Sequence, residues 1–351
     1  MRLVFVTQKV DPESPVLGAT VAKLHALAAR VDEVVVLADE SVAGALPSNC
    51  RVHLFASGTK AGRGAHFTAA LLGEFRRRPK PAAVIAHMCP IYAVLAAPIA
   101  RTAGTPVILW FAHWKRTRTL DLAIRLSTVV ASVDVRAVPV HDRKVVGIGH
   151  GIDVTEFACR DRTLHPGSLE ALALGRYSSA KGLETIVRAV GLARASGVDV
   201  RLRCHGTAGN QQEREDRAAL GKLVGELGLG DIVVLGDPVP RPDVPELLGS
   251  ADVLVNNMRP GAPDKVVFEA CACCLPVLVS NPLFDSLLDD LVPPLRFDRE
   301  SAAQLAERLM VMAALPVDER RTLGRTLRKR VIEQHSVESW ADRIVALAGA
   351  S

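Results

Sequence analysis

Short apolar runs rich in β-branched residues recur through the first third of the chain. The runs are LVFVT (3–7), EVVVLA (33–38), RVHLFA (51–56), AAVIAH (82–87), PVILWFA (106–112) and TVVAS (128–132). Each is followed by a Gly- or Pro-marked turn or by a segment with helical spacing. Such alternation is typical of a parallel β-sheet covered by helices on both faces, so we expect an α/β fold.

The same alternation starts again after about residue 165. Its apolar runs are LEALALG (169–175), VRLRCHG (200–206), DIVVLGD (231–237), DVLVNN (252–257) and PVLVSN (276–281). An irregular polar stretch at 150–168 separates the two series and is interpreted as a linker. We therefore predict two doubly wound, Rossmann-like domains, with a ligand cleft between the carboxyl ends of their strands.

The domain boundaries follow from this restart. We predict an N-terminal domain over 1–158, a second domain over 159–335 and a closing helix over 336–351. The closing helix carries its apolar residues at helical spacing, namely Val337, Trp340, Ile344 and Leu347. We expect it to pack back toward the N-terminal domain.

One uncharged stretch, at 82–100, is long enough to suggest a membrane span. Its two prolines and the central His87 instead indicate a strand to His87, a turn at Cys89 and Pro90, and a short buried helix. Residues 2–6 are too short for the core of an export signal, so we expect a cytoplasmic protein.

Composition narrows the classes of function. The net charge is only +5 and aromatic residues make up 4%, which does not fit the basic, aromatic-rich surface of a nucleic-acid-binding protein. The seven cysteines match neither a disulfide framework nor the paired spacing of a zinc site. We expect them to be reduced core residues, as in the cytosol.

The segment LALGRYSSAKGLETIVRAV, at 172–190, could bind an anion. A strand ends at Gly175, two cations follow at Arg176 and Lys181, and Gly182 precedes a helix. Backbone N–H groups at a helix start together with two cations would suit a phosphate. The alternative interpretation is a surface turn with two solvated charges.

A second candidate is the segment APDKVVFEACACC, at 262–274. Asp264 and Lys265 mark the entry to a helix, and Glu269 follows Lys265 by one turn on the same helix face. A carboxylate in that position can accept hydrogen bonds from two vicinal hydroxyls, as in dinucleotide-binding folds. The alternative is an ordinary surface ion pair between Lys265 and Glu269.

These segments resemble, in order and spacing, the landmarks of the retaining, GT-B fold glycosyltransferases of family 4. The resemblance covers HGIDVTEF, LALGRYSSAKG, ELGLGDIVVLGDPV, ADVLVNNM and PDKVVFEACACCLPVLVSN, between about 149 and 281. The N-terminal half is similar more loosely, through Gly18, ILWFAHW and VVASVD. The resemblance implies two Rossmann-like domains facing each other across a cleft, the first binding the acceptor and the second a nucleotide sugar.

The resemblance also implies roles for residues of this chain. Arg176 and Lys181 would hold the donor diphosphate, and Glu269 would bind the nucleotide ribose. Backbone N–H groups near Lys265 and Val266 would cap the phosphates, with Asp264 at the same entry. Gly18 would let the first loop approach the diphosphate and the sugar, and His113 would lie near the transferred sugar. The sequence departs from the family at Gly261, where a glutamate that contacts the sugar is common.

The chemistry implied is sugar transfer to an acceptor hydroxyl with retention, by front-face attack and without a metal. Two cations and a helix N-terminus would stabilise the leaving diphosphate. The sequence contains no Asp-x-Asp pair, which agrees with metal independence and with no cofactor beyond the sugar nucleotide. The alternative is a non-catalytic relative that binds a sugar nucleotide or a partner protein, suggested by Gly261.

A nicotinamide dehydrogenase is a third hypothesis, because GIGHG at 147–151 offers glycines after a strand. It is rejected because no helical pattern follows these glycines. The acceptor is left open between a glycan, a lipid-linked molecule and a small molecule. The basic segments 74–80 and 113–118 suggest weak peripheral membrane contact, or simply solvated helix ends.

Overall fold

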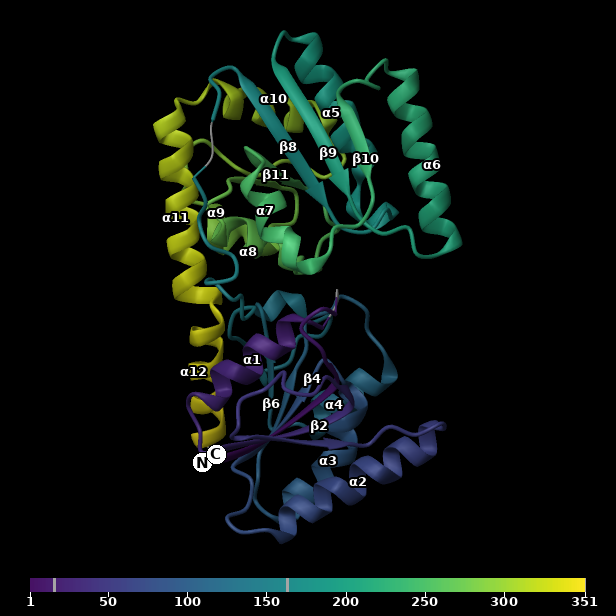
Figure 1. Ribbon diagram of the computed structural model, residues 1–351, viewed down its shortest axis with the longest axis vertical. Helices are drawn as coiled ribbons and strands as arrows, with labels where there is room; N and C mark the ends of the chain where they lie inside the picture. The colour runs from purple at the N-terminus through teal and green to yellow at the C-terminus, as the bar shows by residue number, and fades with distance from the viewer. Residues whose placement is uncertain (15–16, 162–163, 351) are drawn as a thin grey trace. The chain divides into compact units, whose positions relative to one another are not determined.

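The computed structural model describes residues 1–14, 17–161 and 164–350. The chain forms two compact units, one of Met1–Asp153 with Gln334–Ser351 and the other of Val154–Glu333. Figure 1 traces both units from the N-terminus in purple to the C-terminus in yellow. The boundaries expected from the sequence, after residues 158 and 335, lie a few residues from these divisions. Residues 162–163 of the predicted linker lie outside the described residues.

The first unit is built on a seven-stranded, fully parallel sheet. Its strands are β1 (Arg2–Val10), β2 (Glu33–Ser41), β3 (Cys50–Leu54), β4 (Ala83–His87), β5 (Val107–Trp110), β6 (Val129–Ser132) and β7 (Val145–Gly147). Their order is β3-β2-β1-β4-β5-β6-β7. The six strands predicted from the sequence are confirmed. The sequence did not predict β7, which has only three residues and no apolar run of its own.

Helices cover both faces of this sheet. They are α1 (Ala19–Ala28), α2 (Lys60–Arg76), α3 (Pro90–Thr102), α4 (Arg118–Leu126) and α12 (Val337–Gly349). Successive strand residues point to opposite faces. Val4 and Val6 therefore join the core that α2, α3 and α4 share. On the other face, Phe5 stacks on His87, and α1 and α12 lie side by side.

The uncharged stretch at 82–100 folds as predicted, into β4 and α3 with Pro90 opening the helix. A proline in the first turn is tolerated because its missing N–H has no partner there. Among the described residues, no helix has the length and apolar character needed to cross a membrane.

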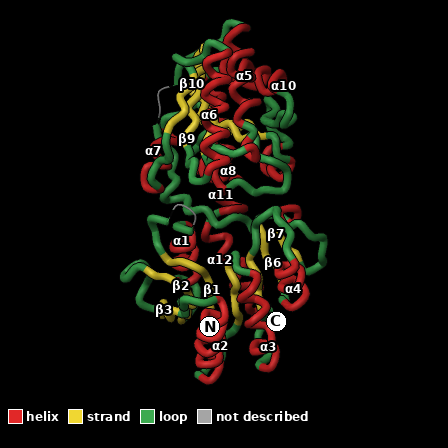
Figure 2. The backbone as a smooth tube through the Cα atoms, turned by 90° about the vertical axis from the view of Figure 1, so that its right-hand side faces the viewer, coloured by secondary structure: helices red, strands yellow, loops and turns green. Residues whose placement is uncertain are grey.

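The second unit has a five-stranded parallel sheet with the order β10-β9-β8-β11-β12. Its strands are β8 (Ser168–Leu174), β9 (Asp199–His205), β10 (Val233–Gly236), β11 (Val253–Asn256) and β12 (Val277–Val279). Its helices are α5 (Leu183–Ala195), α6 (Gln211–Glu226), α7 (Val244–Gly249), α8 (Lys265–Ala272), α9 (Asp285–Leu288), α10 (Ala302–Ala314) and α11 (Val317–His335). All five predicted strands are confirmed, and α5 packs beside α10 (Figure 2).

Several helices begin at a polar residue whose side chain accepts a hydrogen bond from the first turn. Thr117 caps α4 through the Leu120 N–H, Asn210 caps α6 through the Glu213 N–H, and Ser336 caps α12 through the Ser339 N–H. Such a cap typically stabilises a helix by about 1 kcal/mol. The apolar residues of α12 then pack into the first unit, where Trp340 and Ile344 are fully buried and Leu347 is half-buried.

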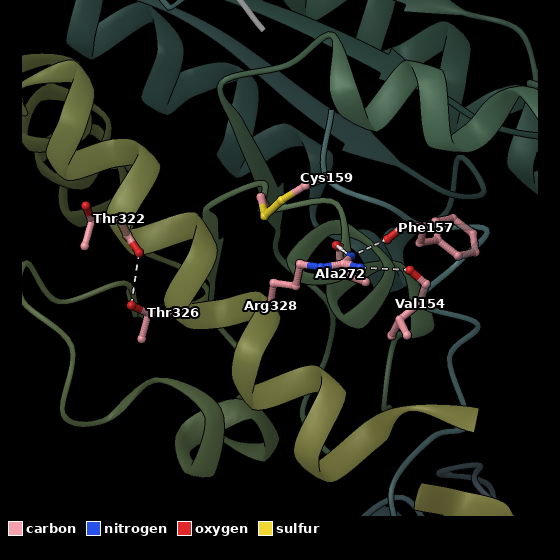
Figure 3. Close-up of a disulfide and its surroundings, with 8 residues drawn as sticks. Val154, Phe157, Cys159, Ala272, Thr322, Thr326 and Arg328 are labelled. Atoms are coloured by element: carbon pink, nitrogen blue, oxygen red, sulfur yellow. Dashed lines mark hydrogen bonds between the residues drawn. A yellow bond between two sulfur atoms is a disulfide. The ribbon is translucent and has the colours of Figure 1, made fainter. Parts of the chain in front are cut away.

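The expectation that all cysteines are reduced is wrong for two of them. Cys159 and Cys274 form a disulfide within the second unit, with their Cα atoms 5.1 Å apart (Figure 3). They are 115 positions apart in the sequence, so spacing gave no sign of the pair. The other five cysteines, Cys50, Cys89, Cys204, Cys271 and Cys273, are free thiols. Arg328 also anchors the linker, donating to the carbonyls of Val154, Phe157 and Ala272.

Candidate functional site

The strand order of the second unit defines one favoured position for a ligand. From β8 the chain proceeds outward through β9 and β10, and then returns to place β11 on the other side of β8. In open α/β sheets, ligands bind at the carboxyl ends of strands where the order reverses in this way. The ends of β8 at Leu174 and of β11 at Asn256 therefore mark the candidate site.

Lys181 lies across the end of β8. Its Nζ donates to the carbonyl oxygen of Leu174 at 3.1 Å and forms an ion pair with Asp264. Gly175 makes room for it, because a Cβ there would lie only 2.3 Å from the Lys181 Nζ. Gly175 also has φ +135°, a backbone conformation that favours glycine. Lys181 is 13% exposed, so the interpretation of a solvated surface charge is wrong for this residue.

Asp264 is the residue immediately before α8, as the sequence predicted. Its carboxylate receives a hydrogen bond from Asn256 Nδ2 at 2.7 Å, in addition to the ion pair with Lys181. The first N–H groups of a helix have no partner within the helix, and its N-terminus carries partial positive charge. Lys265 and Val266 provide the first two of these groups in α8. The turn thus combines backbone donors, a cation and an amide.

Glu269 is buried, with a side chain only 6% exposed. Its Oε1 lies 2.7 Å from Lys265 Nζ and 3.6 Å from an Arg241 guanidinium nitrogen. Arg241 also pairs with Glu156 at 2.7 Å and lies over the Phe157 ring. The Lys265–Glu269 pair considered from the sequence therefore exists, but its carboxylate is buried and its lysine is only 25% exposed, unlike an ordinary surface pair. Two cations offset the cost of burying this carboxylate.

Arg176 follows Gly175 and differs from Lys181 in its surroundings. Its side chain is 69% exposed, and it forms an ion pair with Glu213 at 3.4 Å. For this residue the interpretation of a solvated charge holds. The structure thus joins Lys181 to Asp264, and Lys265 to Glu269, at the first turns of α8, while Arg176 points largely to solvent.

Gly261 stands where the resembled family often has a glutamate. It has φ +78°, and a Cβ added there would meet no atom within 4 Å. Space for a larger residue is therefore available, whereas the backbone conformation favours glycine. The nearest polar side chain in the sequence that follows is that of Asp264.

The two remaining predicted site residues, His113 and Gly18, belong to the first unit. His113 lies on the exposed loop after β5, accepts a hydrogen bond from the Lys115 N–H at 3.0 Å and stacks on Trp114. Gly18 immediately precedes α1 and has φ −53°, which any residue can adopt. A need for glycine there would come from close approach of another group, not from backbone conformation.

The two basic segments are exposed to different degrees. The residues at 113–119 are all exposed. In the segment 74–80, Glu74 is buried and forms ion pairs with Arg2 and Arg51. The basic residues at the end of this segment are exposed.

Sequence reasoning missed three residues of this region, Asn256, Arg241 and Glu213. Asn256 could have been found, because a polar residue at the carboxyl end of a buried strand is typical of a ligand-binding edge. Arg241 lies between two prolines at the start of a short 3₁₀ helix, and Glu213 lies in the first turn of a charged helix. Neither position carries a local signal that sets it apart from an ordinary surface charge.

A separate cavity of about 450 Å³ lies beside the turn of the second unit that carries Lys181. It is lined by residues of this turn, of α5, of α6 and of the segment before α10, including Ser179, Gly182, Asp216 and Arg299. The predicted site residues are not part of this lining. In the described part of the chain, no three His, Cys, Asp or Glu side chains group closely enough to hold a metal ion.

The two parallel α/β sheets with their covering helices have the GT-B fold, which this chain shares with solved structures of low sequence identity. The chain is similar to a glycosyltransferase from Rickettsia africae, with a TM-score of 0.76 at 13% identity, covering 99% of this chain and 98% of the other. It is similar also to Anabaena Alr3699/HepE, solved with UDP and glucose, with a TM-score of 0.72 at 15% identity over 100% of both chains.

The sequence comparison is more specific for the second unit. Residues 158–330, which lie within the second unit, match the family described as Glycosyl transferases group 1. A D-inositol 3-phosphate glycosyltransferase from Pseudarthrobacter chlorophenolicus is 30% identical over 140 residues, which is 37% of this chain. The match spans 32% of that relative's own length.

Proposed function

We propose that the protein is a retaining, metal-independent glycosyltransferase of family 4. It would transfer a sugar from a nucleotide diphosphate sugar to an acceptor hydroxyl. The observation that carries this proposal is the group of Lys181, Asp264 and Asn256 at the entry to α8, next to buried Glu269, in a Glycosyl transferases group 1 domain. A non-catalytic binding role is not favoured by the family match.

In the proposed donor site, the diphosphate and the ribose of the nucleotide bind at two neighbouring places near the start of α8. Lys181 and the N–H groups of Lys265 and Val266 would bind the diphosphate and stabilise the negative charge that grows as the sugar leaves. Arg176 is exposed and on the same loop, so it is able to turn toward the diphosphate. Glu269 would accept hydrogen bonds from the ribose hydroxyls, while Lys265 and Arg241 hold its carboxylate in place.

Retention would follow from attack by the acceptor hydroxyl on the same face that the diphosphate leaves. A phosphate oxygen would take the acceptor proton, so no protein carboxylate is needed as a nucleophile. His113 and Gly18 of the first unit are proposed to contact the sugar. The negative charge of the leaving group would be balanced by protein cations and amides without a metal ion.

The acceptor of the relative, as its name states, is D-inositol 3-phosphate. A phosphorylated polyol is therefore the first acceptor to test with this chain. Lys115 and Arg116 on the exposed loop of the first unit, and Arg118 at the start of α4, offer positive charge for such an acceptor. We also propose weak peripheral contact with anionic membranes through the two basic segments. Equal sedimentation with anionic and neutral vesicles at low salt would contradict that part.

The direct test is donor turnover with matched variants. Nucleotide sugars of uracil, guanine and adenine are incubated with D-inositol 3-phosphate and with water as acceptors, with and without a chelator. We expect one donor class to be consumed, with an unchanged rate in the chelator and retained configuration in the product by NMR. Lys181→Ala and Glu269→Gln should each lower kcat/KM by at least about tenfold, roughly 1.4 kcal/mol in transition-state binding.

Controls for these variants are available on α6. Lys222 and Glu226 form an exposed pair on that helix, so Lys222→Ala and Glu226→Gln make the same chemical changes away from the site. Their activity should equal that of the wild type. Binding of a nucleotide sugar without turnover for every acceptor, or equal losses in the control variants, would contradict the proposal.

A further inference from the structure

Asp264 is an unusual residue for a diphosphate-binding turn. It places a carboxylate at the N-terminus of α8, held by the proposed diphosphate lysine, Lys181, and by the buried amide of Asn256. These three partners, a helix N-terminus, a lysine and an amide donor, are the ones that a phosphate would use. The carboxylate of Asp264 therefore occupies a position with the hydrogen-bond donors and positive charge that would also suit a phosphate.

The other cations named at this site are balanced in the same manner. Lys265 and Arg241 face Glu269, and Arg176 faces Glu213. Each of these positive side chains already has a carboxylate close by. Together these ion pairs leave the named side chains of the turn close to neutral. They therefore offer little excess positive charge to stabilise an additional negative charge on the ligand. Asp264 is paired directly with Lys181, so it would lie next to the terminal phosphate.

The donor and the product of sugar transfer differ in charge at that phosphate. In a nucleotide sugar, both phosphates are diesters or anhydrides, with one negative charge each. In the released nucleoside diphosphate, the terminal phosphate can lose a second proton, with a pKa of about 6 as for other phosphate monoesters. Above that pH the product has one negative charge more than the donor, on the group next to Asp264.

We infer that Asp264 determines the preference of this site for the intact nucleotide sugar over the free nucleoside diphosphate. Its carboxylate repels the extra charge of the product. It also offers the sugar a hydroxyl acceptor, in a region where Gly261 provides none. This inference rests on the proposed function, because it requires the diphosphate to lie at Lys181. Asp264 would thereby assist product release, which limits the rate of many enzymes.

The test compares the dissociation constants of matched pairs by calorimetry. The probes are UDP with UDP-glucose, GDP with GDP-mannose, and ADP with ADP-glucose, at a pH of about 8, well above the phosphate pKa. Asp264→Asn keeps the size of the side chain and removes its charge. We expect this variant to bind the nucleoside diphosphate about three- to thirtyfold more tightly, the range for one added charge at roughly 6 to 8 Å in a partly screened site. Binding of the nucleotide sugar should change less or weaken.

The matched control is Asp231→Asn. Asp231 is exposed and lies before β10, at the amino edge of the sheet and opposite the candidate site. It changes the net charge of the unit by the same amount, and we expect the ratio of the two dissociation constants to equal that of the wild type. An equal change in both ligands for Asp264→Asn, or weaker binding of both, would overturn the inference.

The wild type provides a test that does not depend on folding of the variant. Lowering the pH from about 8 to about 5.5 removes the extra charge of the nucleoside diphosphate but leaves the nucleotide sugar unchanged. The diphosphate should then bind more tightly relative to the sugar nucleotide. The opposite trend would contradict a role for Asp264, since a purely cationic site prefers the more highly charged ligand. Failure of all six probes to bind the wild type would instead contradict the proposed function itself.

Discussion

Lys181 and Gly175 show how one glycine supports a charged site. The lysine reaches Asp264 and the Leu174 carbonyl by passing over a residue that has no side chain. A side chain at position 175 would collide with the Lys181 ammonium, and the positive φ would add backbone strain. The position of the lysine is therefore determined by backbone geometry as much as by its ion pair.

Gly175→Ala should weaken nucleotide diphosphate binding by at least about tenfold, because the new Cβ displaces Lys181. Gly197→Ala is the control. Gly197 has φ +88°, but a Cβ added there would meet no atom within 4 Å. This control therefore also places an alanine at a positive φ, with a backbone strain of roughly 1 to 3 kcal/mol, but without the collision. Calorimetry on both variants measures the difference, and equal binding by the two would show that Lys181 does not need this space.

His335 makes the first unit sensitive to acid. Burial, assisted by Arg343 and partly opposed by Asp134, lowers the pKa of His335 from 6.5 to about 4. The unfolded chain therefore takes up this proton at a higher pH than the folded chain. Stability is fully present above a pH of about 6.5 and falls as the pH decreases toward about 4, by on the order of 3 kcal/mol.

His335→Gln should reduce this loss, and urea unfolding at pH values between about 7 and about 4.5 measures it. His141→Gln is the control, because His141 is exposed. Part of the acid sensitivity should persist, since burial and the charge of Lys23 also hold the pKa of His87 well below its usual value. An identical pH dependence in wild type and His335→Gln would contradict the assignment.

At the scale of elements, the short helix α8 is held at its start by the loop that carries Asp264 and just after its end by the disulfide. The helix begins after Asp264, and its last turn lies next to Cys274, which is joined to the linker at Cys159. Arg328 of α11 donates to the carbonyls of Ala272, Phe157 and Val154 and strengthens this connection (Figure 3). The helix that carries Glu269 is therefore held at both ends.

The disulfide predicts a definite number of thiols. Without reductant, the unfolded protein should show five reactive thiols of the seven cysteines, and all seven after reduction. Cys159→Ser should lower the free energy of unfolding of the second unit by about 2 to 4 kcal/mol, because the bond closes a long loop. Cys50→Ser, which removes a free and partly exposed thiol, should have little effect. Seven thiols before reduction would contradict the pairing.

Most elements could be predicted from sequence because buried parallel strands produce continuous β-branched runs. β7 could not, since three residues do not form a recognisable run. Lys181, Asp264 and Lys265 were recognisable because each lies where a strand or loop enters a helix. Their surroundings were not, because Asn256 and Arg241 reach the site only through the tertiary fold. The disulfide was missed for the same reason.

At the scale of the whole molecule, the chain leaves the first unit near residue 154 and returns to it near residue 334. The family match covers 158–330, which is almost the extent of the second unit. The family match therefore does not extend to the first unit, which is similar to the solved structures in its fold. We expect the stability of the first unit to depend on α12, because α12 packs on α1 within that unit.

Trp340 is the centre of that packing. It is fully buried, meets Trp110 edge to face at 6.4 Å, and lies 5.1 Å from the Lys23 ammonium. Trp340→Ala should destabilise the first unit by about 3 to 5 kcal/mol, as expected for a buried aromatic residue. Trp114→Ala, at an exposed tryptophan of the same unit, should cost much less. Urea unfolding followed by circular dichroism tests this, and equal costs would contradict it.

The central claim is that a nucleotide sugar binds at the point where the strand order of the second unit reverses. The most direct measurement is a crystal structure of the protein soaked with the donor that it consumes. We predict the diphosphate within hydrogen-bonding distance of Lys181 and the first N–H groups of α8, and the ribose at Glu269. A donor bound instead in the cavity lined by Ser179, Asp216 and Arg299, with Lys181 still paired to Asp264, would contradict the account.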